Sequence, residues 1–597
     1  MVETPTADSP AEPDITRVDP SSEKTWFGHP AQLARLFTTE MWERFGFYGM
    51  RALLTLYLTQ HFLFGDRQAT GLYGGFTALV YLTPLIGGYL ADQFLGSKRA
   101  VKFGAILMAF GYLTLCFGGE TAKPFATIDG QRYEVQIEAN NGTETRYVLD
   151  GERRLAIKGN DDGTVSLLND AGAVDRTVAK GGFVSDGERS PFFVTVMLIA
   201  LCMVSVGNGF FKPNISTMVG ELYAPGDRRR DTGFTIFYMG INLGSLGSQL
   251  LCPLLATTIG WWAGFGLAAI GMFFSWFLIQ FDGGRLSGYG EPPAGQGPQR
   301  ALGIYAAALL GVPLFYLLFS NLMNAEPPAP GAGILGYVLS LPLMGKLLFG
   351  TFLVAVPGIL VWSYANGDRR EFQMMVAAMV LIIFNVVFWT LFEQAGSSLT
   401  LFADRNTELS VFGLFNISAG QTQFFNAFFI VAFAPIMAAL WTTLAKRGIE
   451  PSIPVKFGIA LMGVGAGFLF LVWGGQFAGP DYKVALWWLA GLYLIHSLAE
   501  LCISPVGLSM VTKLSIVRIV GLMMGVWFLS ISVAQYVAGI VAQVASVETV
   551  GGQVTNLKVS LDTYNGVFWT IGIASAVIGL VLLALSPIIK KWMHGVQ

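Results

Sequence analysis

The chain has 597 residues, of which 53% are hydrophobic and 13% are charged, and its mean hydropathy is +0.55. Soluble domains carry about a quarter charged residues, so this composition excludes a soluble protein and indicates a chain that crosses the membrane many times. The formal net charge of −2 provides no basic surface, and no nucleic-acid partner is expected. We find no metal-ligand spacing, nucleophile–base pair or phosphate loop, so we expect no metal, no cofactor and no enzymatic activity.

The N-terminal segment 1–30 is acidic and rich in Pro, Ser and Thr, without the basic and apolar regions of a secretory signal. We therefore expect a disordered cytoplasmic N-terminus, with insertion directed by the first membrane helix.

Apolar segments of roughly 18 to 28 residues follow about fourteen times, each long enough to cross a hydrocarbon layer of ~30 Å. Basic residues gather in alternate short connections, which predicts that both termini are cytoplasmic, and a bacterial inner membrane is the expected location. The expected spans are 34–63, 70–95, 99–119, 192–220, 232–256, 259–281, 301–323, 333–363, 372–402, 422–445, 455–475, 485–513, 519–545 and 564–589.

One connection, 121–189, reads as a soluble insert. Alternating runs such as "QRYEVQI" and "TRYVL", separated by "NNGT" and "NDDGT", predict short strands and turns. The topology places this β-rich insert outside the cytoplasm. It is interpreted either as a tolerated loop insertion or as a module that docks a partner there.

Two stretches resemble each other weakly: "SVGNGFFKPNISTMV" around Pro213 and "SLAELCISPVGLSMV" around Pro505. Two parallel repeats of six helices would give this pattern. We expect one bundle at 31–281 and another at 370–590, with an extra two-helix hairpin at 301–363 between them. Repeats of this kind place a substrate site where the halves meet.

The apolar stretch "TTEMWERFGFYGMRALLTLYL" is interrupted at helical spacing by Glu40, Glu43, Arg44 and Arg51. At 100° per residue these charges, together with Phe47 and Tyr48, fall on one stripe about 140° wide. An uncompensated charge near the bilayer centre costs at least about 2.5–3.5 kcal/mol, so the stripe needs partners or a water-filled cavity. It is either an ion-paired seam between two helices or the wall of a pathway.

Charges in other predicted helices favour the pathway, although each alone could serve an internal ion pair. They are Lys212 in "FFKPNIS", Glu393 in "FWTLFEQAGSS" and Glu500 in "SLAELCISP". With the stripe, the set has four carboxylates and three cations. If all share one cavity, the surplus carboxylate should take up a proton, which is the outline of a proton-coupling device.

The stretch "EMWERFGFYGMRALL" resembles the ExxER signature of the proton-dependent oligopeptide transporter family, within the major facilitator superfamily. "GGYLADQFLGSKRA", "FKPNIS", "FYMGINLGS", "FWTLFEQAGSS" and "ELCISPVGLS" resemble further motifs of that family or superfamily, in the same order. The resemblance covers roughly 30–120 and 190–590.

This resemblance implies an all-α polytopic membrane protein with the major facilitator superfamily fold, made of two six-helix bundles and an extra hairpin. It implies a proton-coupled symporter that imports di- and tripeptides by alternating access. Proton coupling is assigned to Glu40, Glu43, Arg44, Lys212 and Glu393. Substrate binding is assigned to Arg51, Tyr48, Tyr81, Lys212, Asn242, Asn426 and Glu500.

Physical chemistry supports these assignments. A peptide presents one ammonium and one carboxylate whatever its side chains, so a site that accepts many peptides should hold both termini with opposite charges. Trp389 is a candidate for an aromatic pocket wall, with core packing as the alternative. For Asn242 and Asn426 the alternative is a hydrogen bond between helices.

The loop "GGYLADQFLGSKRA" is the candidate gate on the cytoplasmic side. Asp92 would bond a neighbouring helix end, and Lys98 or Arg99 would latch the closed inner gate. The alternative is an ordinary loop that follows the positive-inside bias.

The chain departs from the family at Phe47, where many members have tyrosine, and at Ala427, where proline is common. Some relatives carry nitrate or other small anions, and a receptor or envelope-complex role through the insert is a further alternative. Glu40, Glu43 and Glu500 favour peptides, because an anion gains nothing from carboxylates.

Overall fold

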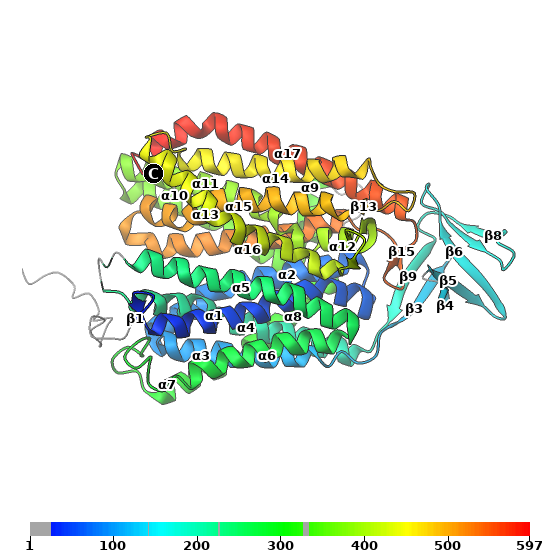
Figure 1. Ribbon diagram of the computed structural model, residues 1–597, viewed down its shortest axis with the longest axis horizontal. Coiled ribbons are helices and arrows are strands. Elements are labelled where there is room, and N and C mark those ends of the chain that lie inside the picture. Colours follow the sequence, from blue (N-terminus) through cyan, green and yellow to red (C-terminus); the bar gives the residue numbers. More distant parts are fainter. Residues whose placement is uncertain (1–24, 141–142, 225–226, 228, 326–332, 597) are drawn as a thin grey trace, which may run out of the picture.

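The structure is a computed structural model that describes residues 25–140, 143–224, 227, 229–325 and 333–596. It is an elongated bundle of helices with a small β-domain at one end (Figure 1). We name this end the insert end, and the opposite end, where the C-terminus lies, the terminal end.

The expected disordered segment 1–30 falls mostly outside the described residues. The part that is described contains two short strands, β1 (Thr25–Trp26) and β2 (His29–Pro30), which pair antiparallel. His29 is buried, and its Nδ1 lies 2.9 Å from Tyr223 Oη. Disorder is therefore not found for residues 25–30.

Helices fill the bundle. Twelve helical runs among the described residues are long and apolar enough to cross a membrane, and α1 and α3, which carry more charges, pack among them on α5 and α4. The predicted set of about fourteen spans is thus present. Their bounds are α1 (Gln32–Leu56), α2 (Asp66–Leu90), α3 (Ser97–Leu115), α4 (Pro191–Glu221), α5 (Arg229–Thr258), α6 (Trp261–Gln280), α7 (Pro298–Leu309), α8 (Gly311–Met323), α9 (Gly333–Ser340), α10 (Leu343–Asn366), α11 (Arg369–Phe392), α12 (Ser398–Asn406), α13 (Phe424–Lys446), α14 (Ile453–Gly475), α15 (Leu486–Leu514), α16 (Val520–Val544) and α17 (Leu557–Trp592).

Three of the predicted spans are interrupted, and the one predicted at 301–323 is divided at Leu310 into α7 and α8. The span predicted at 372–402 consists of α11, a 3-10 turn (Glu393–Gly396) and α12, and the non-helical Ser397 separates the last two. The span predicted at 333–363 is divided into α9 and α10, and Pro342 lies directly before the first residue of α10. Because proline has no N–H and disfavours helical geometry in the residue before it, the helix is interrupted there.

The helices form two sets, α1–α6 and α11–α17, which we name the N-terminal and C-terminal sets and which are drawn from blue to green and from yellow to red in Figure 1. Helices α2 and α16 pack together where the sets meet. The extra hairpin spans both sets, because α8 packs on α2 and α4 while α10 packs on α11 and α16. This architecture confirms the predicted fold class.

The insert between α3 and α4 is one antiparallel sheet of seven strands in the order β8-β7-β6-β5-β4-β3-β9. β8 and β9 lie at opposite edges although only residues 179–182 connect them, so the sheet must curl until these edges approach each other. We name this curled sheet the barrel, although β8 and β9 form no ladder with each other among the described residues. Apolar side chains such as Val148, Leu155 and Phe183 fill its interior. The strands are β3 (Lys123–Ile128), β4 (Gln131–Asn140), β5 (Thr143–Asp150), β6 (Arg153–Gly159), β7 (Val165–Leu168), β8 (Val174–Val178) and β9 (Phe183–Glu188).

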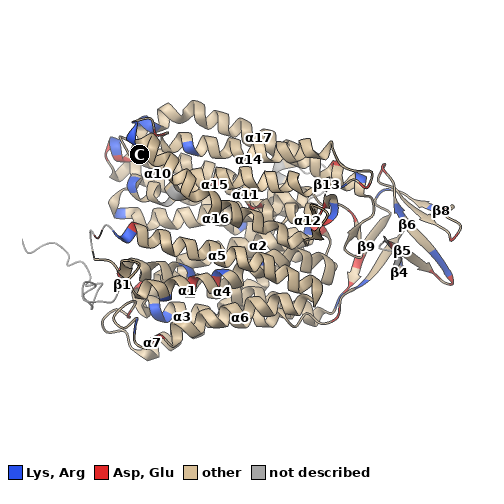
Figure 2. Ribbon diagram, viewed as in Figure 1, with Lys and Arg blue, Asp and Glu red and all other residues tan. Residues whose placement is uncertain are grey.

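Lys and Arg residues of the helices gather mainly at the terminal end, whereas the middle of the bundle carries few charged residues (Figure 2). The few charged residues at mid-bundle are those that form the candidate site.

Candidate functional site

The charged stripe of α1 is buried inside the bundle. Glu40 and Arg44 are each 3% exposed, and Glu43 is fully buried. Arg44 Nη2 donates to Glu43 Oε1 at 2.7 Å, its Nε bonds the other oxygen of that carboxylate, and this Nε lies 3.3 Å from Glu40 Oε1. The guanidinium of Arg44 therefore forms ion pairs with two carboxylates.

Asn208 of α4 completes the surroundings of Arg44. Its Oδ1 accepts from Arg44 Nη2 at 3.4 Å, and its Nδ2 donates to Val80 O of α2 at 2.8 Å. Asn208 thus fixes Arg44 to two further helices. Sequence reasoning missed it, because an asparagine in a glycine-rich membrane helix gives no signal of which partner it meets.

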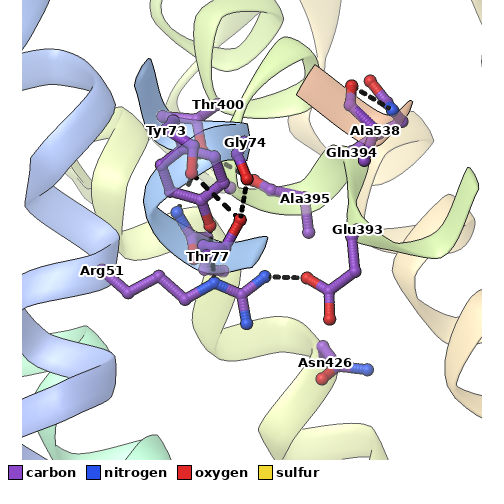
Figure 3. Close-up of polar contacts among 12 residues, drawn as sticks. Arg51, Tyr73, Gly74, Thr77, Glu393, Gln394, Ala395, Thr400, Asn426 and Ala538 are labelled. Carbon is purple, nitrogen blue, oxygen red and sulfur yellow. Dashed lines mark hydrogen bonds and ion pairs between the residues drawn. The ribbon is translucent and has the colours of Figure 1, made fainter. Parts of the chain in front are cut away.

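A second buried ion pair joins the two helix sets. Arg51 Nη2 is bonded to the carboxylate of Glu393, in the 3-10 turn between α11 and α12, and Arg51 Nε donates to Tyr73 Oη at 2.6 Å (Figure 3). The ring of Tyr48 lies 5.8 Å from the Arg51 guanidinium carbon. In this conformation the guanidinium of Arg51 is bonded to other side chains of the protein and is not free to bind a ligand.

Two charges at the site lack ion pairs. Lys212 Nζ of α4 lies 4.2 Å from the centre of the Tyr81 ring, and none of the described carboxylates comes within 4.0 Å of it. Across the site, Asn426 of α13 donates to Glu500 Oε2 of α15 at 3.3 Å and to Ser497 Oγ at 3.0 Å. Glu500 likewise has no cation within 4.0 Å in the described part of the chain.

Two of the expected binding residues make other contacts. Asn242 of α5 is half-buried, and its Nδ2 donates to Tyr238 O one turn earlier in the same helix. Trp389 is half-buried and packs edge-on against Phe388 and Phe392, at ring distances of 5.3 Å.

The candidate gate lies at the terminal end and is not a loop, because a π-helix (Ala91–Leu95) continues α2 and α3 begins at Ser97, which leaves only Gly96 non-helical. Asp92 is exposed and, among the described residues, its side chain makes no hydrogen bond or ion pair. The expected bond from Asp92 to a helix end is therefore not formed in this conformation. Lys98 Nζ lies 3.0 Å from Asp282 Oδ2 and donates to Leu286 O at 3.2 Å. Arg99 Nη1 is buried without a hydrogen-bond partner among the described residues.

Sequence reasoning also missed a buried ion pair at the insert end. Arg405 of α12 holds Asp66 of α2 through two hydrogen bonds, at 2.6 and 2.5 Å, and a third bond of 3.1 Å joins it to Tyr564 Oη. Both charged side chains are at most 1% exposed. Each lies at the end of an apolar run, where a charge is normally read as facing water.

Contacts between the two helix sets run from the middle of the bundle to the insert end. They include Thr55 Oγ1 to Gly396 O at 2.5 Å and Gln421 Nε2 to Leu250 O at 3.0 Å. Towards the terminal end, the face of α2 that carries Tyr81 becomes exposed at Leu85 (41%) and Tyr89 (62%). The site is therefore closed on the insert side and more exposed towards the terminal end.

A membrane-spanning bundle of two helix sets, with buried charges where the sets meet, defines a membrane transporter. A family model described as the POT family matches residues 98–291 and 352–557. The chain belongs to this family, whose members are transporters and not enzymes.

Individual relatives agree with this assignment. The chain is 32% identical to the uncharacterized transporter YclF of Bacillus subtilis, over 96% of this chain and 97% of that protein. It is 29% identical to the dipeptide and tripeptide permease A of Edwardsiella piscicida, over 95% and 96% of the two chains. A crystal structure of a peptide transporter POT in complex with sulfate matches 97% of this chain and all of that chain, at 28% identity and a TM-score of 0.71.

Proposed function

We propose that the chain is a proton-coupled symporter that imports di- and tripeptides by alternating access. The observation that carries the proposal is that Lys212 and Glu500, which lie on different helix sets, form no ion pair with any of the described residues. A peptide's carboxylate and ammonium match these two charges. A relative named for dipeptides and tripeptides and a similar structure named for peptides support the same ligand class.

In this proposal Lys212 binds the peptide carboxylate, and Glu500 with Asn426 binds the ammonium. Tyr48 and Tyr81 line the space between them, where aromatic surface makes few directional demands on the peptide side chains. Arg51 joins the carboxylate only after it leaves Glu393, since the two are bonded in the present conformation.

Glu40 and Glu43 carry the coupling proton. Glu40 Oε2 is buried and has no hydrogen-bond partner among the described residues, so a proton there removes a buried negative charge. Protonation of the pair weakens its hold on Arg44, which then attracts the peptide carboxylate together with Lys212. Loss of the proton restores the ion pairs and releases the peptide.

The bodies that move are the predicted bundles 31–281 and 370–590, with the hairpin 301–363 alongside. Because the basic residues gather at the terminal end, that end faces the cytoplasm of a bacterial cell and the insert lies outside. The present structure is then the conformation open to the cytoplasm. The proton and the peptide shift the equilibrium between this form and the outward-open form only to the extent that their affinities for the two forms differ.

Uptake of labelled dialanine into proteoliposomes, with and without an inward proton gradient, tests the proposal. We expect gradient-driven uptake by the wild-type protein, and its loss in Glu40→Gln and Glu43→Gln while counterflow of peptide persists. Glu408→Gln, which alters an exposed carboxylate at the insert end, is the matched control and should transport normally.

The rival function gives a different result in the same assay. If dialanine does not enter but labelled nitrate does, the stripe on α1 is structural or binds anions, and the peptide proposal is wrong. If both glutamine variants retain gradient-driven uptake, the coupling proton is not carried by this pair.

A further inference from the structure

The barrel inserted between α3 and α4 also contacts the C-terminal set. The connection between α16 and α17 contains a small hairpin, β14 (Thr549–Val550) and β15 (Gln553–Val554), and β14 packs against β3 and β9. Val550 is fully buried among the apolar residues of the barrel interior. One set therefore supplies part of the core of a domain carried by the other.

Polar contacts reinforce this junction. Gly159 N of β6 donates to Thr555 O at 3.3 Å, and Asn556 Nδ2 donates to Gly159 O at 3.1 Å and to Asp161 Oδ1 at 3.0 Å. Lys558 Nζ pairs with Asp161 Oδ2 at 2.5 Å. Hydrogen bonds from Lys558 and Asn556 lower the pKa of Asp161, so this carboxylate is charged at neutral pH.

The junction is tied directly to a transmembrane helix. Asn556 Oδ1 accepts from Lys558 N at 2.9 Å and from Val559 N at 3.1 Å, which caps α17. The side chain that holds the barrel is thus the same one that begins α17. A displacement of α17 must be transmitted to the barrel or must break these contacts.

The opposite side of the barrel is fixed to the N-terminal set. Arg189 Nη1 donates to Phe62 O at 3.2 Å, and the Arg189 guanidinium carbon lies 4.2 Å from the centre of the Phe64 ring. Ala122 N donates to His61 O at 2.9 Å. Both ends of the insert are therefore held at the turn between α1 and α2.

We propose that the barrel is a clasp that holds the two helix sets together at the insert end and must release the segment 549–558 before this end opens. The inference rests on the proposed alternating-access function, because only a transporter that opens at both ends needs such a release. The clasp favours the conformation that is closed at the insert end, which is the conformation of the present structure.

A reversible cross-link tests the release. A Cβ placed on Gly159 would lie 3.0 Å from Thr555 Cβ, about 0.5 Å closer than the shortest separation usual in disulfides, so a small shift of the segment at Thr555 should let Gly159→Cys cross-link with Thr555→Cys on oxidation. We expect oxidation to lower both uptake and counterflow of dialanine about tenfold, and reductant to restore them. The single-cysteine variants are the controls. Unchanged transport by the fully oxidised protein would overturn the proposal.

A second measurement does not depend on the substrate. Spin labels at Arg67 and Leu414, both exposed at the insert end of different sets, report the separation of the sets there. Lys558→Ala and Val550→Ser should each increase the population at longer distance. Arg153→Ala breaks the Arg153–Asp175 ion pair within the barrel and should leave it unchanged.

The two measurements separate the proposals. Identical distance distributions in wild type, Lys558→Ala and Val550→Ser would refute the clasp even in a working peptide transporter. If reduced protein fails to carry peptides while the distances shift as expected, the clasp stands and the peptide substrate is wrong.

Discussion

Gly74 of α2 and Gly539 of α16 meet backbone to backbone where the two helix sets join. A Cβ on Gly74 would lie 2.7 Å from Gly539 Cα, and a Cβ on Gly539 would lie 3.0 Å from Gly74 Cα. No flexible side-chain end can yield at this contact, so the approach of the helices depends on the absence of both methyl groups.

Gly539→Ala should therefore force α2 and α16 apart and lower the free energy of unfolding by about 1–3 kcal/mol. Thermal unfolding in detergent measures the loss as a lower Tm. Gly350→Ala in α10, where nothing lies within 4 Å, is the control and should leave Tm unchanged or slightly raised. Equal Tm values for wild type and Gly539→Ala would show that the contact is looser than described.

Asp66→Asn should be strongly destabilising, because it leaves the Arg405 guanidinium buried without its counter-charge. Breaking a buried pair in this way costs about 3–5 kcal/mol, which thermal unfolding in detergent would detect as a large fall in Tm. Replacing both partners, with Asp66→Leu and Arg405→Met, should recover part of the loss. If the double variant is no more stable than Asp66→Asn, the effect comes from the lost bond to Val547 N and not from the unpaired charge.

Blocked peptides should separate the roles of Glu500 and Lys212. A hydrogen bond to a charged group contributes about 1.5–3 kcal/mol, so Glu500→Gln should weaken dialanine binding at least about tenfold. It should not affect binding of N-acetyl-dialanine, which has no ammonium. Lys212→Gln should show the reverse selectivity, with dialanine amide as the unaffected ligand, in competition assays against labelled dialanine. Equal losses for free and blocked peptides would assign both side chains to folding.

The contact between Lys98 and Asp282 should not set the pH dependence of transport. Burial acts to raise the pKa of Asp282, but hydrogen bonds from Lys98 Nζ and from the N–H groups of Gly284 and Leu286 lower it overall from 3.8. The folded protein therefore binds this proton less readily than the unfolded chain. The contribution to stability is complete above the ordinary pKa and disappears only as the pH falls through the lowered value.

Between about pH 5 and 8, Asp282→Asn should thus change the rate of peptide uptake but keep the shape of its pH profile. Glu40→Gln should flatten the profile, since it removes the proposed proton carrier. A shifted profile in Asp282→Asn would mean that the gate at the terminal end takes part in proton coupling.

Hydropathy and charge periodicity predicted the helices, the barrel strands and the buried stripe on α1, because each depends on local sequence. The pairing of Asp66 with Arg405 could not be predicted, since it joins positions 339 residues apart that both lie at the ends of apolar runs. The break in the helix at Glu393 also left no clear pattern. There the 3-10 turn Glu393–Gly396 replaces the α-helix, and the backbone of Ser397 then departs from helical geometry within an apolar stretch.

The burial of Val550 in the barrel could not be predicted from the sequence either. Val550 lies in "VETVGGQVTN", which the sequence presents as an ordinary connection between two apolar helices. Its burial depends on the barrel, whose strands begin at Lys123 and end at Glu188, far earlier in the chain.

The junction between barrel and hairpin lies beyond the ends of the membrane helices, on a surface that water-soluble molecules reach directly. A protein that binds across it and holds the segment 549–558 in place would restrain both helix sets at once. Such a binder would slow the transporter from outside the bilayer without competing for the charged site, so strength of inhibition would be independent of peptide concentration.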